Sequence, residues 1–141
     1  MHPLYHKAAG LTHDVIGSAI EVHKDKGPGL LESIYEWCLT IELNERGYRT
    51  NNQEQVIVKY KSFHRLYPLR FDLLVDDCLI VEVKAVESTL PIHKAQVLSY
   101  MKLLDIPLGL VINFNVPKLT DGVSRLMLPD ADDSFSAVPK F

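Results

Sequence analysis

The sequence lacks the features of a disulfide-rich, secreted or membrane-spanning protein. Its 141 residues include two cysteines, Cys38 and Cys78, which have no CxxC spacing and so form neither a disulfide framework nor a zinc site. Both stand among apolar neighbours, and we interpret them as core residues. No apolar run is long enough to span a bilayer, and the first residues lack the apolar stretch of a signal peptide. We therefore expect a cytoplasmic protein with no membrane partner.

The sequence also has little excess charge. Lys and Arg number 15 against 18 Asp and Glu, a formal net charge of -3, which is not the balance of a protein that coats nucleic acid. Some of the acids would be offset if they held a divalent cation. The length and the 47% hydrophobic content predict one domain over residues 1–141. We expect its core at about 11–128 and a peripheral acidic tail at 129–141.

Hydrophobic periodicity predicts the element order α-α-β-β-β-α-β-β. A first helix is expected to begin near Thr12 as its N-cap, and Gly27-Pro28-Gly29 ends it. A second helix is expected at about 31–46, and a third at 91–104 with Thr89 as a possible cap. The predicted strands lie at about 55–61, 69–75, 78–86, 108–115 and 123–128. A helix between strands indicates an α/β fold with a mixed sheet flanked by helices on both faces.

Two charged residues interrupt the apolar strand predicted at 78–86. Glu82 and Lys84 are two positions apart, so they share one face of that strand. Burying an unpaired charge costs several kcal/mol, which is comparable with the whole stability of a small domain. These charges therefore need a partner, and a divalent metal is one.

Asp72 lies ten positions before Glu82, on the preceding predicted strand. Opposed residues of a hairpin share a face. Asp72 opposes Glu82 if the pairing is centred on Asp77, which requires a loop of odd length or a bulge. A two-residue Asp76-Asp77 loop would instead oppose Asp72 to Val81 and separate the two acids.

With the first geometry, the two carboxylates converge on one point. Asp72, Glu82 and the backbone carbonyl of Val83 would then offer the hard oxygen ligands that suit Mg²⁺ or Mn²⁺. Lys84 would orient or activate a water, or neutralise charge that develops on a phosphate. The competing interpretation is a solvated hairpin with an ordinary Glu82–Lys84 pair.

Other polar residues could serve the same centre. His93, Gln96 and Tyr100 are spaced three and four apart and share one helix face; a solvated face would look the same. Glu32 stands in the first turn of the second predicted helix, where an acid is also common because it complements the helix dipole.

Basic residues cluster between Val56 and Phe71, where the sequence contains no acid. Aromatic residues lie among them, and this combination suits a nucleic-acid strand as well as it suits a solvated basic hairpin. We assign His93 to the same interface. The basic residues are Lys59, Lys61, Arg65 and Arg70, and the aromatic residues are Tyr60, Phe63 and Tyr67.

The segment Gly27-Pro28-Gly29-Leu30-Leu31-Glu32-Ser33-Ile34-Tyr35 resembles the signature of the GxxExxY proteins, a family of the PD-(D/E)XK nuclease superfamily. The resemblance covers about residues 11–128, and the chain departs from it at Ser62, where a turn glycine is typical, and at Tyr67-Pro68-Leu69. Further matching segments are Ile20–Lys24, Asp72–Val75, Ile80–Val86, His93–Tyr100 and Leu110–Phe114.

The resemblance implies a restriction-endonuclease-like core with Asp72, Glu82 and Lys84 on an active-site hairpin. It also implies that Glu32 helps to hold the metal or its water, and that Gln96 and Tyr100 line the same site. The expected activity is metal-dependent hydrolysis of phosphodiester bonds, in DNA with RNA as an alternative. Two other readings stay open: a binding or regulatory module with little or no catalysis, and a subunit that needs a partner or a homodimer to complete a DNA groove.

Overall fold

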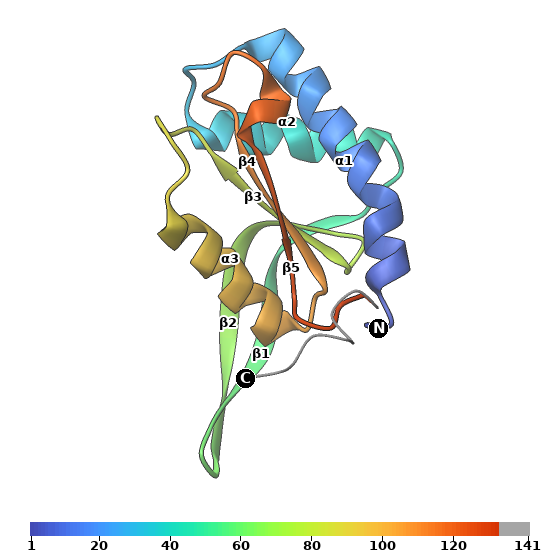
Figure 1. Cartoon of the computed structure of the whole chain (residues 1–141), viewed down its shortest axis with the longest axis vertical. Coiled ribbons are helices and arrows are strands. Elements are labelled where there is room, and N and C mark those ends of the chain that lie inside the picture. Colours follow the sequence, from blue (N-terminus) through green and yellow to red (C-terminus); the bar gives the residue numbers. More distant parts are fainter. Residues whose placement is uncertain (133–141) are drawn as a thin grey trace.

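The computed structural model describes residues 1–132, which form three α-helices around a five-stranded sheet (Figure 1). None of these helices is long and apolar enough to cross a membrane. The element order confirms the predicted α-α-β-β-β-α-β-β. The elements are α1 (Tyr5–Lys26), α2 (Glu32–Glu45), β1 (Thr50–Tyr60), β2 (Phe63–Val75), β3 (Leu79–Lys84), α3 (Pro91–Leu104), β4 (Leu108–Asn113), the short 3₁₀-helix η1 (Leu119–Gly122) and β5 (Val123–Met127).

The sheet is mixed, with the strands in sequence order from β1 to β5. Strands β3 and β4 are parallel, and the other neighbouring pairs are antiparallel. A parallel pair needs a crossover connection, and α3 is that crossover. The predicted mixed sheet within an α/β fold is therefore confirmed.

Helices cover both faces of the sheet, as predicted. Leu79, Val81 and Val83 of β3 belong to a core cluster with residues of α1 and α2. Ile80, between them, packs in a second cluster with Val97 and the neighbouring part of α3. Because β3 is buried on both faces, its sequence reads as an almost continuous apolar run. The two cysteines are unpaired and pack in or against the first cluster, as predicted.

Helix α1 begins at Tyr5, so the prediction that Thr12 caps its start is wrong. Thr12 is 4% exposed, and its hydroxyl donates a hydrogen bond to the Ala8 carbonyl at 2.8 Å. The helix continues towards the N-terminus because Ala8 and Leu11 extend the buried stripe by further turns. That packing outweighs the preference of threonine for a helix end.

Strands β1 and β2 form a hairpin longer than the sequence predicted, because β1 begins at Thr50 rather than at about residue 55 and β2 begins at Phe63 rather than at about residue 69. The turn between them is at Lys61 and Ser62. The hairpin extends away from the rest of the molecule (Figure 1). Residues 63–68 are exposed, so no alternation of buried and exposed residues marks them as a strand. Backbone pairing, which ends at Tyr60 opposite Phe63, forms the strand there.

Packing reaches beyond the range 11–128 predicted for the core. Ala8 is fully buried, and Ala131 is 1% exposed. The backbone N–H of His2 donates to the Ala131 carbonyl at 2.9 Å, which ties the two ends of the described chain together. Of the predicted acidic tail, residues 133–141 lie outside the described residues.

Candidate active site

Asp72 and Glu82 lie opposite each other across the β2–β3 hairpin. The register pairs Leu73 with Val81, and the next position outward pairs the two acids. The connecting loop runs from Asp76 to Cys78, an odd length, and the Cys78 N–H donates to the Val75 carbonyl at 3.1 Å. The sequence had left two hairpin geometries open, and this is the one that brings the carboxylates together.

The two carboxylates are held by the backbone of the opposite strand. The Asp72 N–H donates to Oε1 of Glu82 at 3.2 Å, and the Val83 N–H donates to Oδ2 of Asp72 at 2.7 Å. These side-chain bonds replace the backbone ladder, whose described pairs between β2 and β3 end at Leu73 and Val81. The hairpin therefore fixes the two acids against each other at the point where its strands separate.

Glu82 is 5% exposed, and its environment disfavours its charged form. Burial raises the pKa of Glu82 to about 8, and repulsion by Asp72 acts in the same direction. The hydrogen bond from the Asp72 backbone and the charge of Lys84 act against this rise. The surroundings therefore hold too little positive charge to keep both acids ionised, and a bound cation would supply more.

Lys84 follows Glu82 on the same face of β3. Its side chain is half-buried, and its backbone carbonyl accepts a hydrogen bond from the Phe114 N–H at 2.9 Å. Between residues 1 and 132, no carboxylate lies within ion-pair distance of its ammonium group. The ammonium is therefore available to another anion at this end of the strand.

Glu32 is the first residue of α2, and its Oε1 accepts a hydrogen bond from the Ala85 N–H at 3.2 Å. The preceding loop is held by Tyr35, whose hydroxyl accepts from the Leu30 N–H at 3.0 Å and donates to the Gly27 carbonyl. The Tyr35 ring is buried and stacks on Phe114 with centroids 4.5 Å apart. This arrangement brings an acid that is forty residues away in sequence from Asp72 to the end of β3.

Glu36 belongs to the same acidic region, although the sequence analysis did not identify it. It lines a pocket of about 550 Å³ with Glu32 and Ala85, and a pocket of about 200 Å³ with Asp72. Burial raises the pKa of Glu36, and the charges of Asp72 and Glu32 raise it further. Its position four residues after Glu32 was the available signal, because such a spacing places two side chains on one helix face.

The donor set fits a hard divalent cation that keeps part of its water shell. No three His, Cys, Asp or Glu side chains between residues 1 and 132 are gathered so that they could hold a metal ion. Mg²⁺, however, is usually bound through one or two carboxylates, together with waters and substrate phosphates. Asp72 and Glu82 are two such carboxylates, and both are already oriented by hydrogen bonds.

The helix residues predicted to line the same centre make other contacts. Gln96 donates from Nε2 to the Tyr100 hydroxyl at 2.9 Å. His93 accepts at Nδ1 from the Leu90 N–H at 3.1 Å and so caps α3. The N-cap residue is Leu90, so the prediction that Thr89 caps this helix is wrong. Of the hydrogen bonds in the described chain, none joins these side chains to the acids of the hairpin.

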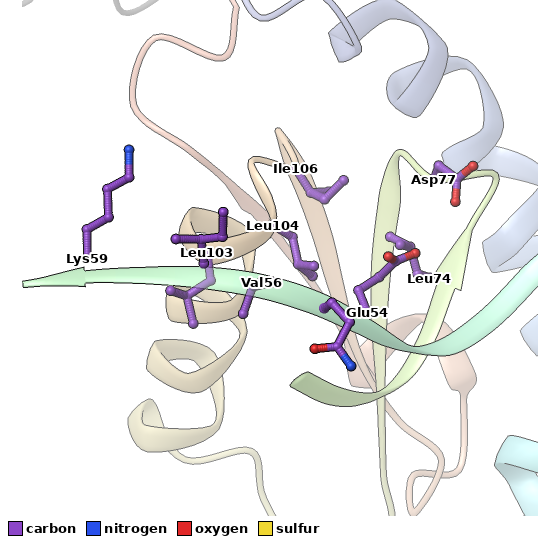
Figure 2. A pocket seen from close by; sticks show the side chains of 10 residues that line it. Glu54, Val56, Lys59, Leu74, Asp77, Leu103, Leu104 and Ile106 are labelled. Atoms are coloured by element: carbon purple, nitrogen blue, oxygen red, sulfur yellow. The ribbon is translucent and has the colours of Figure 1, made fainter. Parts of the chain in front are cut away.

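The predicted basic residues all lie on the β1–β2 hairpin. Lys59 lines a groove of about 640 Å³ between β1 and the end of α3 (Figure 2). None of the acids just described lines that groove, so the volume of a groove does not locate the candidate active site. Arg70 is near Asp72 on β2, whereas Lys61 and Arg65 are close to the hairpin turn.

These elements define a class of protein. A mixed sheet with helices on both faces, and two acids with a lysine at the divergent end of a central hairpin, is the architecture of restriction-endonuclease-like enzymes. A comparison with protein families matches residues 9–126 to the PD-(D/E)XK nuclease superfamily. The chain belongs to this superfamily. Searches of curated proteins and of solved structures found no match.

Proposed function

We propose that this protein is a metal-dependent nuclease that hydrolyses phosphodiester bonds in DNA. The observation that carries the proposal is the opposition of Asp72 and Glu82 across the hairpin, with Lys84 beside them. Membership of a nuclease superfamily supports the reaction class. The basic and aromatic hairpin supports a nucleic acid as the substrate.

In this proposal Asp72, Glu82 and the Val83 carbonyl would hold Mg²⁺ or Mn²⁺, and Glu32 would help to hold the cation or one of its waters. The bound cation would polarise a phosphate oxygen and lower the pKa of a water. Hydrolysis would join the oxygen of a water to phosphorus, break the ester bond on the opposite side and pass one proton of that water to the leaving oxygen. Lys84 orients the attacking water and neutralises charge on the phosphate.

The remaining predicted residues have supporting roles in the proposal. Gln96 and Tyr100 line the site when substrate is bound. The nucleic-acid contacts are those predicted from the sequence, namely Lys59, Lys61, Arg65, Arg70 and His93. A homodimer that completes the groove and a cytoplasmic location stay predictions.

We also propose that the chain is a GxxExxY protein. Gly29, Glu32 and Tyr35 occupy the signature positions. Gly29 adopts φ 95°, a conformation that other residues rarely take. Tyr35 holds the loop that leads to Glu32. These contacts give each signature position a physical reason within one short segment.

The first experiment is calorimetric titration of Mg²⁺ and Mn²⁺ into the wild type, Asp72→Asn and Glu82→Gln. We expect binding in the wild type that both variants lose, because each variant removes one of the two paired carboxylates. Asp121→Asn is the matched control, since Asp121 is an exposed acid of η1 outside the hairpin; it should bind like the wild type.

Cleavage of plasmid and oligonucleotide DNA in the presence of Mn²⁺ follows, with Lys84→Ala as the comparison. Lys84→Ala should keep metal binding and lose most of the cleavage. If the wild type binds metal in the presence of DNA and still leaves every DNA intact, the nuclease proposal is wrong. The binding or regulatory module with the same fold would then be the better account.

A further inference from the structure

The β1–β2 hairpin exposes several large apolar side chains to solvent. They stand on both of its strands. Exposed apolar side chains on a projecting element are typical of an interaction surface where they lie on one face and form a contiguous patch. The exposed fractions are 56% for Ile57, 70% for Tyr60, 73% for Phe63, 59% for Leu66 and 43% for Tyr67.

The strand register gathers the aromatic rings on one face of the hairpin. Tyr60 pairs with Phe63, and Val56 pairs with Tyr67. Opposed residues share a face, as do alternate residues along a strand, so the three rings stand in one row with Arg65. Val56, at the base of this row, is 5% exposed and lines the groove against α3 (Figure 2). The row therefore begins at the body of the protein and runs outward to the turn.

Positive charges lie within the same row. The Lys61 ammonium lies 5.3 Å from the centre of the Tyr60 ring, and the Arg65 guanidinium lies 5.1 Å from the centre of the Tyr67 ring. The sequence has no acid between Val56 and Phe71. The outer part of the hairpin, between Val56 and Phe71, therefore presents flat aromatic faces and cations together, with no acid of its own to repel a phosphate.

A double helix can engage only the cations of this surface, whereas an unpaired strand can engage both the cations and the aromatic rings. A duplex offers its phosphates to the cations, but its base faces are stacked inside. An unpaired strand also offers base faces to aromatic rings, each worth about 1–3 kcal/mol by stacking. We propose that the row formed by Tyr60, Phe63, Arg65 and Tyr67 binds single-stranded DNA.

This inference rests on the proposed nuclease and names its substrate as DNA with an unpaired segment. Tyr67 precedes Asp72 on β2 by five residues, which corresponds to roughly 16 Å at the rise of a strand. A bound strand of a few nucleotides can therefore span the distance between the row and the paired acids. The two other partners that fit exposed rings are an apolar protein surface and a second copy of this chain. An apolar protein surface would leave the acid-free run of cations unused, and sedimentation tests for a second copy.

The test measures binding apart from cleavage, by fluorescence anisotropy with Asp72→Asn protein in chelator. The probes are an oligothymidylate and a duplex of equal length. We expect the unpaired strand to bind at least about tenfold more tightly. The double change Tyr60→Leu and Phe63→Leu keeps the apolar surface and the charges, so its effect reports stacking. It should weaken the oligothymidylate at least about tenfold and leave the duplex nearly unchanged.

Two controls separate the contributions. Arg65→Gln removes a charge, and we expect it to weaken both probes and to reduce the salt dependence of binding. Trp37→Ala removes an aromatic ring that is 66% exposed on α2, and it should change nothing. The residues of the row and of α2 that these variants replace are all exposed, so each variant should keep its fold.

Equal binding of both probes, or a leucine double variant that binds oligothymidylate like the wild type, would overturn the inference. So would a wild type that ignores both probes but self-associates through Tyr60 and Phe63 in sedimentation. Because these measurements use an Asp72→Asn protein in chelator, a failure of the metal chemistry would leave their result intact. The two proposals therefore fail separately.

Discussion

Asn113, the last residue of β4, should contribute more to stability than any exposed polar side chain of this protein. It is 2% exposed, and its side chain completes the sheet beyond β3. Oδ1 accepts from the backbone N–H groups of Val86 and Asn115, both at 3.1 Å, and Nδ2 donates to the Val86 carbonyl at 2.9 Å. The residue therefore anchors the chain two positions after Lys84.

Asn113→Ala removes three hydrogen bonds at once. A hydrogen bond of this kind contributes about 1 kcal/mol, and a partner left buried without a replacement costs about 1–3 kcal/mol. Val86 and Asn115 are half-buried, so water can replace part of the loss. We expect the free energy of unfolding to fall by about 3 kcal/mol, a large part of the roughly 5–15 kcal/mol typical of a domain.

Urea denaturation of the wild type, Asn113→Ala and Asn115→Ala measures this effect. Asn115 is the matched control because, within residues 1–132, its side chain makes one long bond, 3.4 Å from Nδ2 to the Val86 carbonyl. The control should lose about 1 kcal/mol or less. If Asn113→Ala costs no more than Asn115→Ala, the side-chain bonds of Asn113 do not hold the end of β3.

Three other outcomes are expected. Without metal, the unfolding free energy should fall as pH rises from about 4.5 to 8, because folded Glu82 keeps its proton up to a pKa of about 8 whereas the unfolded chain loses it near 4.3. Urea denaturation at several pH values measures this slope, and Glu82→Gln should flatten it. An unchanged slope in the variant would refute the assignment to Glu82. Burial raises the pKa of Cys78 to about 11, so a thiol reagent at pH 8 should modify Cys78 only after unfolding, as mass mapping of the native protein would reveal. Tyr35→Phe keeps the stack on Phe114 but removes both loop bonds; it should lower the unfolding free energy by about 1–3 kcal/mol, and a change within error would show that the loop does not depend on the hydroxyl.

The local pattern of the sequence predicted much of the fold. Strand β3 was recognisable because it is covered on both faces and therefore apolar throughout. Helix α2 ends before Gly47, whose φ of 92° is the conformation that a glycine after a helix supplies. Helix α3 begins at Pro91, which fits the first turn of a helix. In each case neighbouring residues carry the information.

Contacts between distant residues decided the remainder. Whether Asp72 meets Glu82 depended on the length of one turn, and Asp76 and Asp77 settle it by adopting φ of 47° and 57°, which aspartate tolerates better than most residues. Glu36 joined the acidic region only when α2 packed beside the hairpin. The sequence by itself thus determined the elements and the types of side chain at the candidate site. The tertiary structure alone decided which of those side chains meet, because a distance across a sheet depends on register and packing rather than on residue type.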